Sequence, residues 1–275
     1  MKISFQGAKG AYSHQACLQA APQLVPLPCP DFASTIQAVH DGLATHAMLP
    51  IDNAVAGRVA DIHHLLPQSG LIIVAEIYLP IRHCVLGLKG STLADITHVH
   101  SHMHALPQCQ KIIAQHSWQK IVASDTAAAA EWVASQTNPS QAAIASAQAA
   151  QIYGLSVLAE NVGDLAQNTT RFLLMTTPQH APLKPYVANQ NFVCSFVFRV
   201  KSMPAALYKA LGGFATNGVN LRKLESYLLD GNFTAAQFYC EVEDHPQSPQ
   251  MQHAMAELSF FATNINVLGV YEQAK

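Results

Sequence analysis

The strongest constraint on the fold is a regular alternation of short apolar runs with helix-like segments along residues 2–176. Runs such as 46–51, 71–79 and 142–145 have the length and composition of buried strands, and segments of helical pattern separate them. Strands that alternate with helices pair into a sheet with helices on both faces. The sequence therefore predicts an α/β region over residues 1–178.

The pattern also predicts the individual elements of this region. Strands are expected at 2–5, 46–51, 71–79, 81–88, 96–100, 121–123, 142–145, 155–160 and 171–176. Helices are expected at 13–20, 31–40, 61–66, 106–116 and 126–135, and after residue 145. Asp31 is placed as the N-cap of the second helix.

A different pattern follows a linker with three prolines at 178–185. Strands are expected at 192–200, 221–229, 233–242 and 265–271, helices at 205–214 and 250–260, and a hairpin turn at Asp230-Gly231. The order β-α-β-β-α-β is that of a ferredoxin-like domain. We therefore expect a second, smaller α+β domain at the C-terminus.

Composition narrows the class of protein. Charged residues make up 12% of the chain, about half the usual share, so we expect part of the surface to be buried between subunits. The net charge of -2 and the lack of a basic run argue against nucleic-acid binding. No secretory signal or apolar run of membrane-spanning length is seen, and the six cysteines are scattered. We expect a cytoplasmic protein with reduced thiols and no membrane contact.

Two candidate sites lie near the N-terminus. The glycine turn at 7–10 stands between a strand and a helix that begins near Ser13, where backbone N–H groups suit an anion. The alternative is an ordinary tight turn. Asp52 and Asn53 follow an apolar strand, and ligands collect at the carboxyl ends of strands in α/β sheets. The alternative there is a turn closed by Asx hydrogen bonds.

Two further candidates lie later in the α/β region. Ser101 and Gln108 are seven residues apart, so on one helix they would share a face; a solvated helix face is the alternative. In Asn168-Thr169-Thr170-Arg171-Phe172, two hydroxyls and an amide stand beside the only arginine between residues 82 and 199. A guanidinium binds carboxylates through two parallel hydrogen bonds. The alternative for this segment is a surface loop before a strand.

Alternating histidines at 98, 100, 102 and 104 would share one face of an extended segment and could bind zinc or copper. However, Ser101 onward is interpreted as a turn entering a helix, which breaks the alternation. The pair at 63–64 has no H-E-x-x-H spacing, and the sequence contains no Walker loop, G-x-S-x-G or G-x-G-x-x-G motif. We expect neither a metal nor a cofactor.

Taken in order, these segments resemble the prephenate dehydratase family over nearly the whole chain. The matching stretches are 7–13, 50–59, 101–109, 124–127, 142–155 and 168–172. The last resembles the family's N-x-T-R-F signature, its most specific motif. Residues 192–271 resemble the ACT regulatory domain that follows it in the family.

The resemblance implies a fold and an assembly. The family has two α/β subdomains of the periplasmic-binding-protein type, with the active site in the cleft between them. One subdomain would comprise residues 1–79 with 160–178, the other 80–159, and the ACT domain 190–275. The family forms dimers or larger oligomers, so a homodimer or homotetramer is expected, in agreement with the low share of charged residues.

The resemblance also implies an activity, a lyase reaction in L-phenylalanine biosynthesis. Prephenate loses water and carbon dioxide to give phenylpyruvate, and aromatisation supplies much of the driving force, so no cofactor is needed. Thr170 would donate to the leaving hydroxyl and Arg171 would bind a substrate carboxylate, with Asn53, Ser101 and Gln108 as further catalytic residues. Substrate contacts are expected from Ser13, Asp52, Thr126, Asn168 and Phe172. Phenylalanine would bind the ACT domain through Ala206, Leu207, Glu225 and Ser226.

The chain departs from the family pattern at several positions. Asp52 stands for the usual Glu, Ala54 for Ser, Ala11 for Thr, and Met103-His104 for Pro-Gln. In the C-terminal domain Ala205 stands for Gly and Tyr227-Leu228 for Arg-Pro. A methyl at Ala205 could crowd a ligand that approaches the backbone. The phenylalanine site therefore rests on weaker sequence support than the catalytic site.

Two alternative functions remain from sequence alone. Arogenate dehydratase performs the same elimination on the aminated substrate, and the sequence does not decide between the two substrates. A non-enzymatic ligand binder with the same cleft, such as a solute receptor or an amino-acid sensor, is the other, because fold alone does not fix function. The absence of an export signal and of an N-terminal helix-turn-helix argues against a receptor or a transcriptional regulator.

Overall fold

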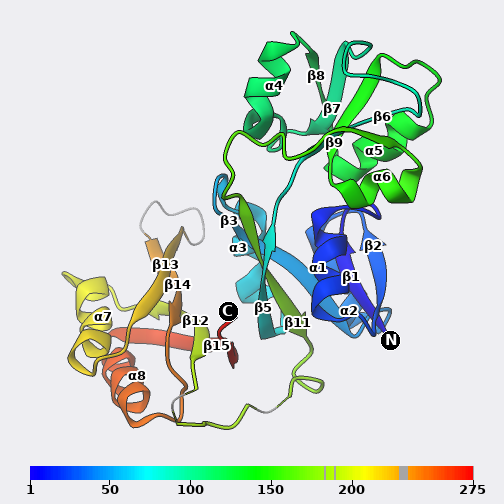
Figure 1. Ribbon diagram of the computed structural model, residues 1–275. Coiled ribbons are helices and arrows are strands. Elements are labelled where there is room, and N and C mark those ends of the chain that lie inside the picture. The colour runs from blue at the N-terminus through cyan, green and yellow to red at the C-terminus, as the bar shows by residue number, and fades with distance from the viewer. Residues whose placement is uncertain (183, 189, 229–234, 275) are drawn as a thin grey trace. The chain divides into compact units, whose positions relative to one another are not determined.

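The computed structural model is shown in Figure 1. The residues that it describes are 1–182, 184–188, 190–228 and 235–274.

Two compact units make up the chain. Unit 1 comprises Met1–His63 and Ile77–Leu174, and unit 2 comprises His64–Glu76 and Met175–Lys275. Each unit therefore consists of two separate stretches of the chain. The polar residues predicted for catalysis all belong to unit 1.

The first sheet of unit 1 has the strand order β5-β11-β3-β1-β2, with β4 paired to β3. β1 runs parallel to both β2 and β3. Its elements are β1 (Lys2–Gln6), α1 (Tyr12–Ala20), β2 (Val25–Cys29), α2 (Phe32–His40), β3 (His46–Asn53), β4 (Gly57–Arg58), α3 (Ala60–Leu65), the 3-10 helix η1 (Leu66–Gln68), β5 (Ile72–Pro80) and β11 (Thr169–Thr176). The whole of η1 and parts of α3, β5 and β11 belong to unit 2.

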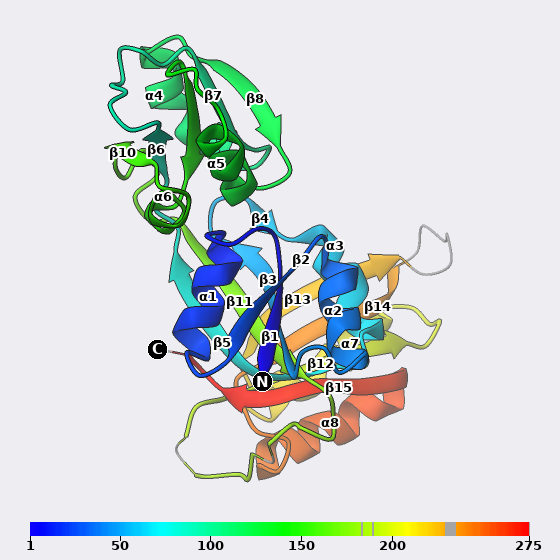
Figure 2. The same ribbon diagram turned by 90° about the vertical axis from the view of Figure 1, so that its right-hand side faces the viewer.

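Local chemistry explains these elements. Ile3 and Phe5 alternate on β1 and are fully buried with Met48 of β3 in one hydrophobic cluster, which fixes which face of the sheet α1 covers (Figure 2). The carboxylate of Asp31 accepts a hydrogen bond of 2.7 Å from the N–H of Ser34 and caps α2. The predicted N-cap is confirmed.

The sequence pattern missed strand β2. Its residues, Val-Pro-Leu-Pro-Cys, include Pro26 and Pro28, and proline argues against a strand because it cannot donate to the ladder. β2 lies at the end of the strand order and pairs with β1 on one side. An edge strand tolerates proline because one of its two sides makes no ladder.

The second sheet of unit 1 has the order β10-β6-β9-β7-β8. β7 runs parallel to β8 and β9, whereas β6 is antiparallel to β9 and β10. Its elements are β6 (Cys84–Gly87), β7 (His98–His102), η2 (Leu106–Cys109), α4 (Gln110–Gln115), β8 (Gln119–Ala123), α5 (Thr126–Ala134), β9 (Gln141–Ala145), α6 (Ala147–Tyr153) and β10 (Ser156–Ala159). The predicted rhythm of strand and helix is confirmed.

The predicted helical pairing of Ser101 with Gln108 is wrong. Strand β7 continues through His102, so Ser101 is a strand residue, whereas Gln108 lies in the 3-10 helix η2. Parallel pairing to β8 holds this end of β7 extended, because Ser101 pairs with Val122 and His102 with Ala123. Within the described part of the chain, no group of His, Cys, Asp or Glu residues is arranged to hold a metal ion.

Two chain segments join the two sheets of unit 1, one before β6 and one after β10. They lie side by side, because the N–H of Val162 donates to the carbonyl of His83 at 2.8 Å and the N–H of Ile81 donates to that of Asn168 at 2.8 Å (Figures 1 and 2). We call these two segments, 80–84 and 159–168, the crossover segments. They place residues of both sheets against each other.

Unit 2 has the β-α-β-β-α-β order predicted for it. Its sheet runs β13-β14-β12-β15, antiparallel throughout, and β15 continues parallel to β5 at Gly269 and Ile73. The elements are β12 (Phe192–Val200), α7 (Ala206–Thr216), β13 (Leu221–Leu228), β14 (Ala235–Val242), α8 (Pro249–Phe261) and β15 (Ala262–Glu272). The predicted turn at Asp230-Gly231 lies outside the described residues.

A buried charged cluster joins β5 to this sheet within unit 2. The guanidinium of Arg222 donates to both carboxylate oxygens of Glu76 at 2.9 Å, and its Nε lies 3.8 Å from a carboxylate oxygen of Glu241. Tyr239 donates to Glu241 at 2.5 Å, and the N–H of Ala274 donates to Glu76 at 3.1 Å. Both glutamates have fully buried side chains, so the arginine is their main charge compensation.

The α/β fold class with a ferredoxin-like second unit is confirmed. The six cysteines are free thiols buried in the two units, so they act as small apolar side chains. In the part of the chain that the structure describes, none of the helices has the length and apolar character needed to cross a membrane.

Candidate functional site

A cluster of amide and hydroxyl groups lies where β3 ends and β11 begins. The side-chain Nδ2 of Asn53 donates to Oγ1 of Thr170 at 2.9 Å and to Oδ1 of Asn168 at 2.8 Å. Its Oδ1 accepts the backbone N–H groups of Val55 and Ala56 at 3.0 and 2.7 Å. Since two backbone donors fix the oxygen, the orientation of the Asn53 amide is determined by the turn itself.

The orientation of Asn53 decides what Thr170 can do. Because Nδ2 of Asn53 can only donate, the hydroxyl oxygen of Thr170 must accept this hydrogen bond. The hydroxyl hydrogen of Thr170 is then available for another acceptor. Thr170 is 8% exposed, so that acceptor would meet the hydrogen in a largely water-free setting. Asn53 therefore prepares Thr170 as a hydrogen-bond donor.

Gln108 extends the cluster into the second sheet. Its Oε1 accepts Nδ2 of Asn168 at 2.7 Å and lies 3.1 Å from Nε2 of His83. The carbonyl oxygen of Gln108 accepts the N–H of Asp164 at 2.7 Å. The Asp164 carboxylate in turn accepts the N–H groups of the first two residues of α4, each at 3.0 Å. Asp164 therefore caps α4 and fixes the position of Gln108.

His83 carries the network one step further. Since Oε1 of Gln108 can only accept, Nε2 of His83 must hold the proton, and burial lowers the pKa of His83 so that the neutral ring is favoured. Nδ1 is then an acceptor, and the hydroxyl of Tyr12 lies 3.1 Å from it. Burial raises the pKa of Tyr12 well above its usual value, so the phenol stays protonated and donates.

One continuous chain of hydrogen bonds results, which we call the relay: Tyr12, His83, Gln108, Asn168, Asn53 and Thr170. Every donor and acceptor in it follows from the two backbone N–H groups that hold Asn53. Each member leaves the next a single orientation. The relay thus links a tyrosine of α1 to the candidate catalytic hydroxyl.

Arg171 is already paired in this structure. Its Nη2 lies 3.3 Å from Oδ2 of Asp52, whose other oxygen lies 3.8 Å from Nε2 of the buried His63. The arginine side chain is 7% exposed and that of Asp52 is 27% exposed. Asp52 is therefore the more exposed member of the pair and orients the guanidinium of Arg171. An incoming carboxylate would compete with Asp52 for that guanidinium.

Other predicted site residues lie outside this cluster. Ser101 is fully buried and donates to the carbonyl of Ile144 at 2.6 Å, which ties β7 to β9. Phe172 is 2% exposed and packs in the hydrophobic cluster of the first sheet. Ser13 lies in the first turn of α1, and Thr126 is the first residue of α5; among the described contacts, neither is hydrogen-bonded to the cluster. Substrate contacts by these four residues stay predictions.

The residues predicted to bind a regulatory ligand lie in unit 2. Ala206 and Leu207 begin α7, and Ala205 before them has a φ of 56°, in the left-handed region that glycine adopts without strain. Glu225 and Ser226 lie on β13, where the carboxylate of Glu225 is 3.7 Å from the ammonium of Lys223. Their role in ligand binding stays a prediction.

Sequence reasoning missed four residues that organise the site: Tyr12, His83, Asp125 and Asp164. Asp125 caps α5 through the N–H groups of its first turn at 2.7 and 2.8 Å, and also accepts the N–H of Ala8 at 3.2 Å. A capping signal before 126–135 could have identified Asp125. The other three are distant in sequence from their partners, and no local pattern marks them.

Comparisons with known proteins were consistent across sequence and structure. A family model described as prephenate dehydratase matches residues 3–180. A relative from Komagataeibacter europaeus, described as a bifunctional N-acyl-homoserine lactone acylase/prephenate dehydratase, is 49% identical and covers 98% of this chain and 95% of that protein. The chloroplastic arogenate dehydratase/prephenate dehydratase 1 of Arabidopsis thaliana is 39% identical, over 98% of this chain and 72% of that protein.

A solved structure gives the same result. The prephenate dehydratase of Arthrobacter aurescens in complex with L-Phe has a TM-score of 0.89 and 29% sequence identity, covering 100% of this chain and 90% of that one. The match therefore extends through both units.

Proposed function

Because the chain belongs to the prephenate dehydratase family, we propose that the cluster around Thr170 converts prephenate to phenylpyruvate, water and carbon dioxide. The observation that carries the proposal is the Asn53 hydrogen bond, which leaves the Thr170 hydroxyl hydrogen free to donate. The chain thus presents a placed donor and, at the next position of β11, a guanidinium, which are the two kinds of group that this elimination uses.

The bonding changes fit these groups. The bond from the ring to its carboxylate breaks and releases carbon dioxide, the electron pair completes the aromatic ring, and the bond from the ring to the hydroxyl breaks. Thr170 donates a hydrogen bond to the departing oxygen, which becomes water with a proton that solvent ultimately supplies. A threonine is a weak acid, so its contribution is a hydrogen bond that strengthens as charge develops in the buried cluster.

Substrate binding falls to Arg171. We propose that one prephenate carboxylate takes a place on its guanidinium, while Asp52 keeps the group oriented from the other side. Asp52 is the shorter carboxylate where the family has glutamate, and at 3.3 Å its contact with Nη2 is longer than a strong charged hydrogen bond. A looser internal contact leaves more of the guanidinium available to the substrate carboxylate while Asp52 stays in place.

The test is conversion of prephenate by the purified protein, followed as phenylpyruvate absorbance in base. Thr170→Ala should lower kcat by about 100-fold or more, by analogy with loss of one placed donor, and Thr170→Ser should keep most activity. Thr97→Ala, an exposed threonine of the same unit, is the control. A wild-type rate no higher than the uncatalysed one would reject the proposal, and a fully active Thr170→Ala would reject the assigned role.

The natural substrate is the next question. The Arabidopsis and Petunia relatives are described as arogenate dehydratases, some of them with prephenate activity as well. Arogenate carries an ammonium where prephenate carries a keto group, and the relay presents no charged partner for it. We propose prephenate as the preferred substrate, and comparison of kcat/KM for the two compounds decides the preference.

A second candidate activity comes from the Komagataeibacter relative, whose description includes N-acyl-homoserine lactone acylase. We propose that activity as a second function of this chain, on the strength of 49% identity over 269 residues. It would add water across the amide bond and release a fatty acid and homoserine lactone. Incubation with N-octanoyl-homoserine lactone, with detection of the freed amine, tests it; no amine above the buffer control would reject it.

Regulation and assembly complete the proposal. We propose that unit 2 is an ACT domain that binds phenylalanine, supported by its ferredoxin-like order and by the L-Phe complex of the Arthrobacter protein. Calorimetric titration with phenylalanine tests this. The homodimer or homotetramer, the cytoplasmic location and the domain boundaries at 178 and 190 stay predictions, and light scattering of the purified chain tests the first.

A further inference from the structure

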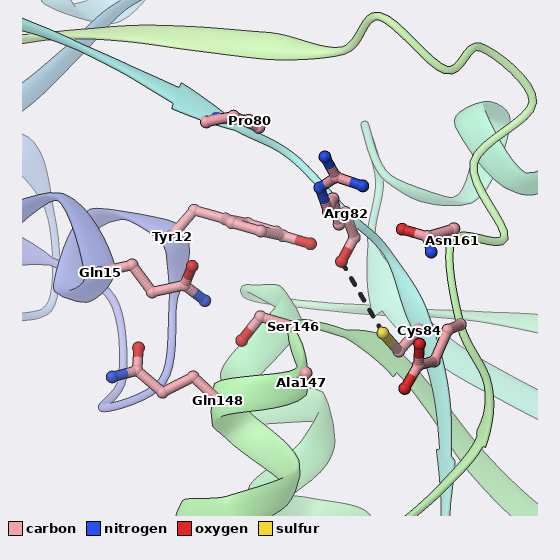
Figure 3. Close-up of a pocket in the computed structure, with 10 residues that line it drawn as sticks. Tyr12, Gln15, Pro80, Arg82, Cys84, Ser146, Ala147, Gln148 and Asn161 are labelled. Carbon is pink, nitrogen blue, oxygen red and sulfur yellow. Dashed lines mark hydrogen bonds between the residues drawn. The ribbon is translucent and has the colours of Figure 1, made fainter.

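A cavity of unit 1 lies beside the crossover segments. Its volume is about 380 Å³, within the range of about 300–1,000 Å³ typical of small-molecule sites. Figure 3 shows Tyr12 entering it from α1 and Ser146 and Ala147 from the start of α6. The lining residues are Tyr12, Gln15, Pro80, Arg82, Cys84, Ser146, Ala147, Gln148, Glu160 and Asn161. Apart from Tyr12, which begins the relay, none of them belongs to the candidate catalytic cluster around Thr170, and we call this cavity the crossover pocket.

The crossover pocket carries one charge of each sign. Arg82 lies on one crossover segment and Glu160 on the other. Within the described residues, neither side chain is engaged in an ion pair or a hydrogen bond of its own, so both charges are available to a ligand. The amides of Gln15, Gln148 and Asn161 add neutral polar groups around them.

The remaining walls are apolar. The Tyr12 ring and Pro80 offer flat surfaces. Cys84 adds a neutral thiol, because burial raises its pKa. A ring can stack on such surfaces while a charged end group stays at the open side.

From these features we propose that the crossover pocket binds a free aromatic α-amino acid. Its carboxylate would be held by the guanidinium of Arg82 and its ammonium by the carboxylate of Glu160, with its ring against Tyr12 and Pro80. A dianion such as prephenate fits poorly, because Glu160 repels its second carboxylate. Arg82 and Glu160 are both exposed, so water solvates each of them, and a ligand with one charge would use only one of the two groups.

The pocket is coupled to the candidate catalytic site, an effect that rests on the proposed dehydratase function. Tyr12 lines the pocket and also begins the relay that ends at Thr170. A ligand that moves the Tyr12 ring changes its hydrogen bond to His83, and through His83 the position of Gln108. Occupation of the pocket should therefore change kcat by about 5-fold or more, the lower range of measured coupling between sites.

Binding is tested on the full chain by calorimetry with L-phenylalanine, L-tyrosine and L-tryptophan. At least one should bind in a manner that depends on both charges, so that Arg82→Ala and Glu160→Gln each raise its Kd about 10-fold or more. Lys89→Ala, which removes an exposed charge outside the pocket, should leave that Kd unchanged. Hydrogen exchange should slow in peptides that contain residues 80–84 and 159–162.

A single-charge series tests whether the ligand uses both charges, and the Arg82→Ala and Glu160→Gln variants separate this site from any site in unit 2. 3-Phenylpropionate and 2-phenylethylamine should each bind the crossover pocket at least 10-fold more weakly than phenylalanine, since each lacks one of the two charges. If all three amino acids fail to bind, or bind equally well to the wild type, Arg82→Ala and Glu160→Gln, the proposal is overturned. Binding does not require turnover, so this result is independent of the dehydratase assay.

Coupling has its own test. Tyr12→Phe keeps the ring that lines the pocket and removes the hydroxyl that donates to His83. The amino acid should still bind to this variant, but its effect on kcat should disappear. Retention of the full effect on kcat would show that the relay does not transmit it.

Discussion

At the scale of single residues, the site depends on how one turn holds one amide. The N–H groups of Val55 and Ala56 fix the oxygen of Asn53, and this orientation sets every donor and acceptor as far as Tyr12. Buried polar networks in which each member has one orientation are sensitive to a change at any of them. Asn53 has the most contacts in this network, so it is the most informative residue to change.

Asn53→Asp replaces the donating amide by a carboxylate of the same size. The new carboxylate would accept the Thr170 hydroxyl hydrogen and repel Oδ1 of Asn168, so we expect kcat to fall by about 100-fold or more with a smaller change in KM. The measurement is steady-state turnover of prephenate. Asn138→Asp is the control, because its recorded bond uses Oδ1 as an acceptor, which a carboxylate preserves. Unchanged kcat in Asn53→Asp would contradict the assigned orientation.

The sequence could predict part of the site and not the rest. Thr170, Arg171 and Asn53 were accessible because they lie in ordered motifs that resemble a family. The roles of His83 and Tyr12 were not accessible, although Tyr12 lies within the matching stretch 7–13, because each acts through a partner 25 or 71 residues away and no local periodicity carries that information. The pairing of Asp52 with Arg171 likewise depends on the register between strands, which follows from the folded sheet.

At the scale of elements, errors occurred where tertiary pairing overrode a local signal. Two prolines argued against β2, yet an edge position accepts them. A turn was expected at Ser101, yet parallel pairing to β8 holds β7 extended through His102. Elements with a cap or a clear period, such as α2 and the strands of unit 2, were predicted correctly because their signals are local.

Helix α7 begins with a strained residue. Ala205 has a φ of 56°, and this conformation costs about 1–2 kcal/mol for a residue with a Cβ. Ala205→Gly should therefore stabilise unit 2 by about 0.5–1 kcal/mol after the greater flexibility of glycine in the unfolded chain is subtracted. Thermal unfolding measures it. The same substitution at Ala256, exposed within α8, should destabilise by about 1 kcal/mol; a loss of stability at both positions would contradict the strain.

At the scale of the whole molecule, ionisable groups set how each unit responds to conditions. In unit 1, burial lowers the pKa of His14, His83, His100 and His102. In unit 2, Arg222 compensates the buried carboxylates of Glu76 and Glu241. The two units should therefore lose stability for different reasons, the first on acidification and the second on loss of one side chain.

Unit 1 should become less stable below about pH 6.5. Each of the four histidines has a folded pKa below the unfolded value of about 6.5, so the unfolded state binds more protons in this range. The free energy of unfolding has its full value above about pH 6.5, and it falls as the pH drops towards the folded pKa values. Thermal unfolding between pH 7.5 and 5.5 measures this. His83→Gln should show a smaller acid-induced loss than wild type, and His253→Gln, an exposed residue of unit 2, should match wild type.

Arg222 should be essential to unit 2. Arg222→Met leaves Glu76 and Glu241 buried without their cation, and we expect a loss of about 3–5 kcal/mol. Adding Glu76→Gln should restore part of it, since one buried carboxylate is removed. Arg199→Met is the control, because Arg199 is exposed. Chemical denaturation measures all of them, and equal losses in the Arg222 and Arg199 variants would contradict the prediction.

The position of strand β5 limits how the chain can be divided and engineered. Its first residues, through Glu76, belong to the C-terminal unit, whereas its last residues lead into the catalytic half. Gly269 lies so close to Ile73 that any added Cβ would come within 2.7 Å of the Ile73 Cβ. A cut in the proline-rich linker would thus separate each half from residues that it needs. Unit 2 therefore cannot be moved to another protein as one contiguous segment, because residues 64–76 must be moved with it.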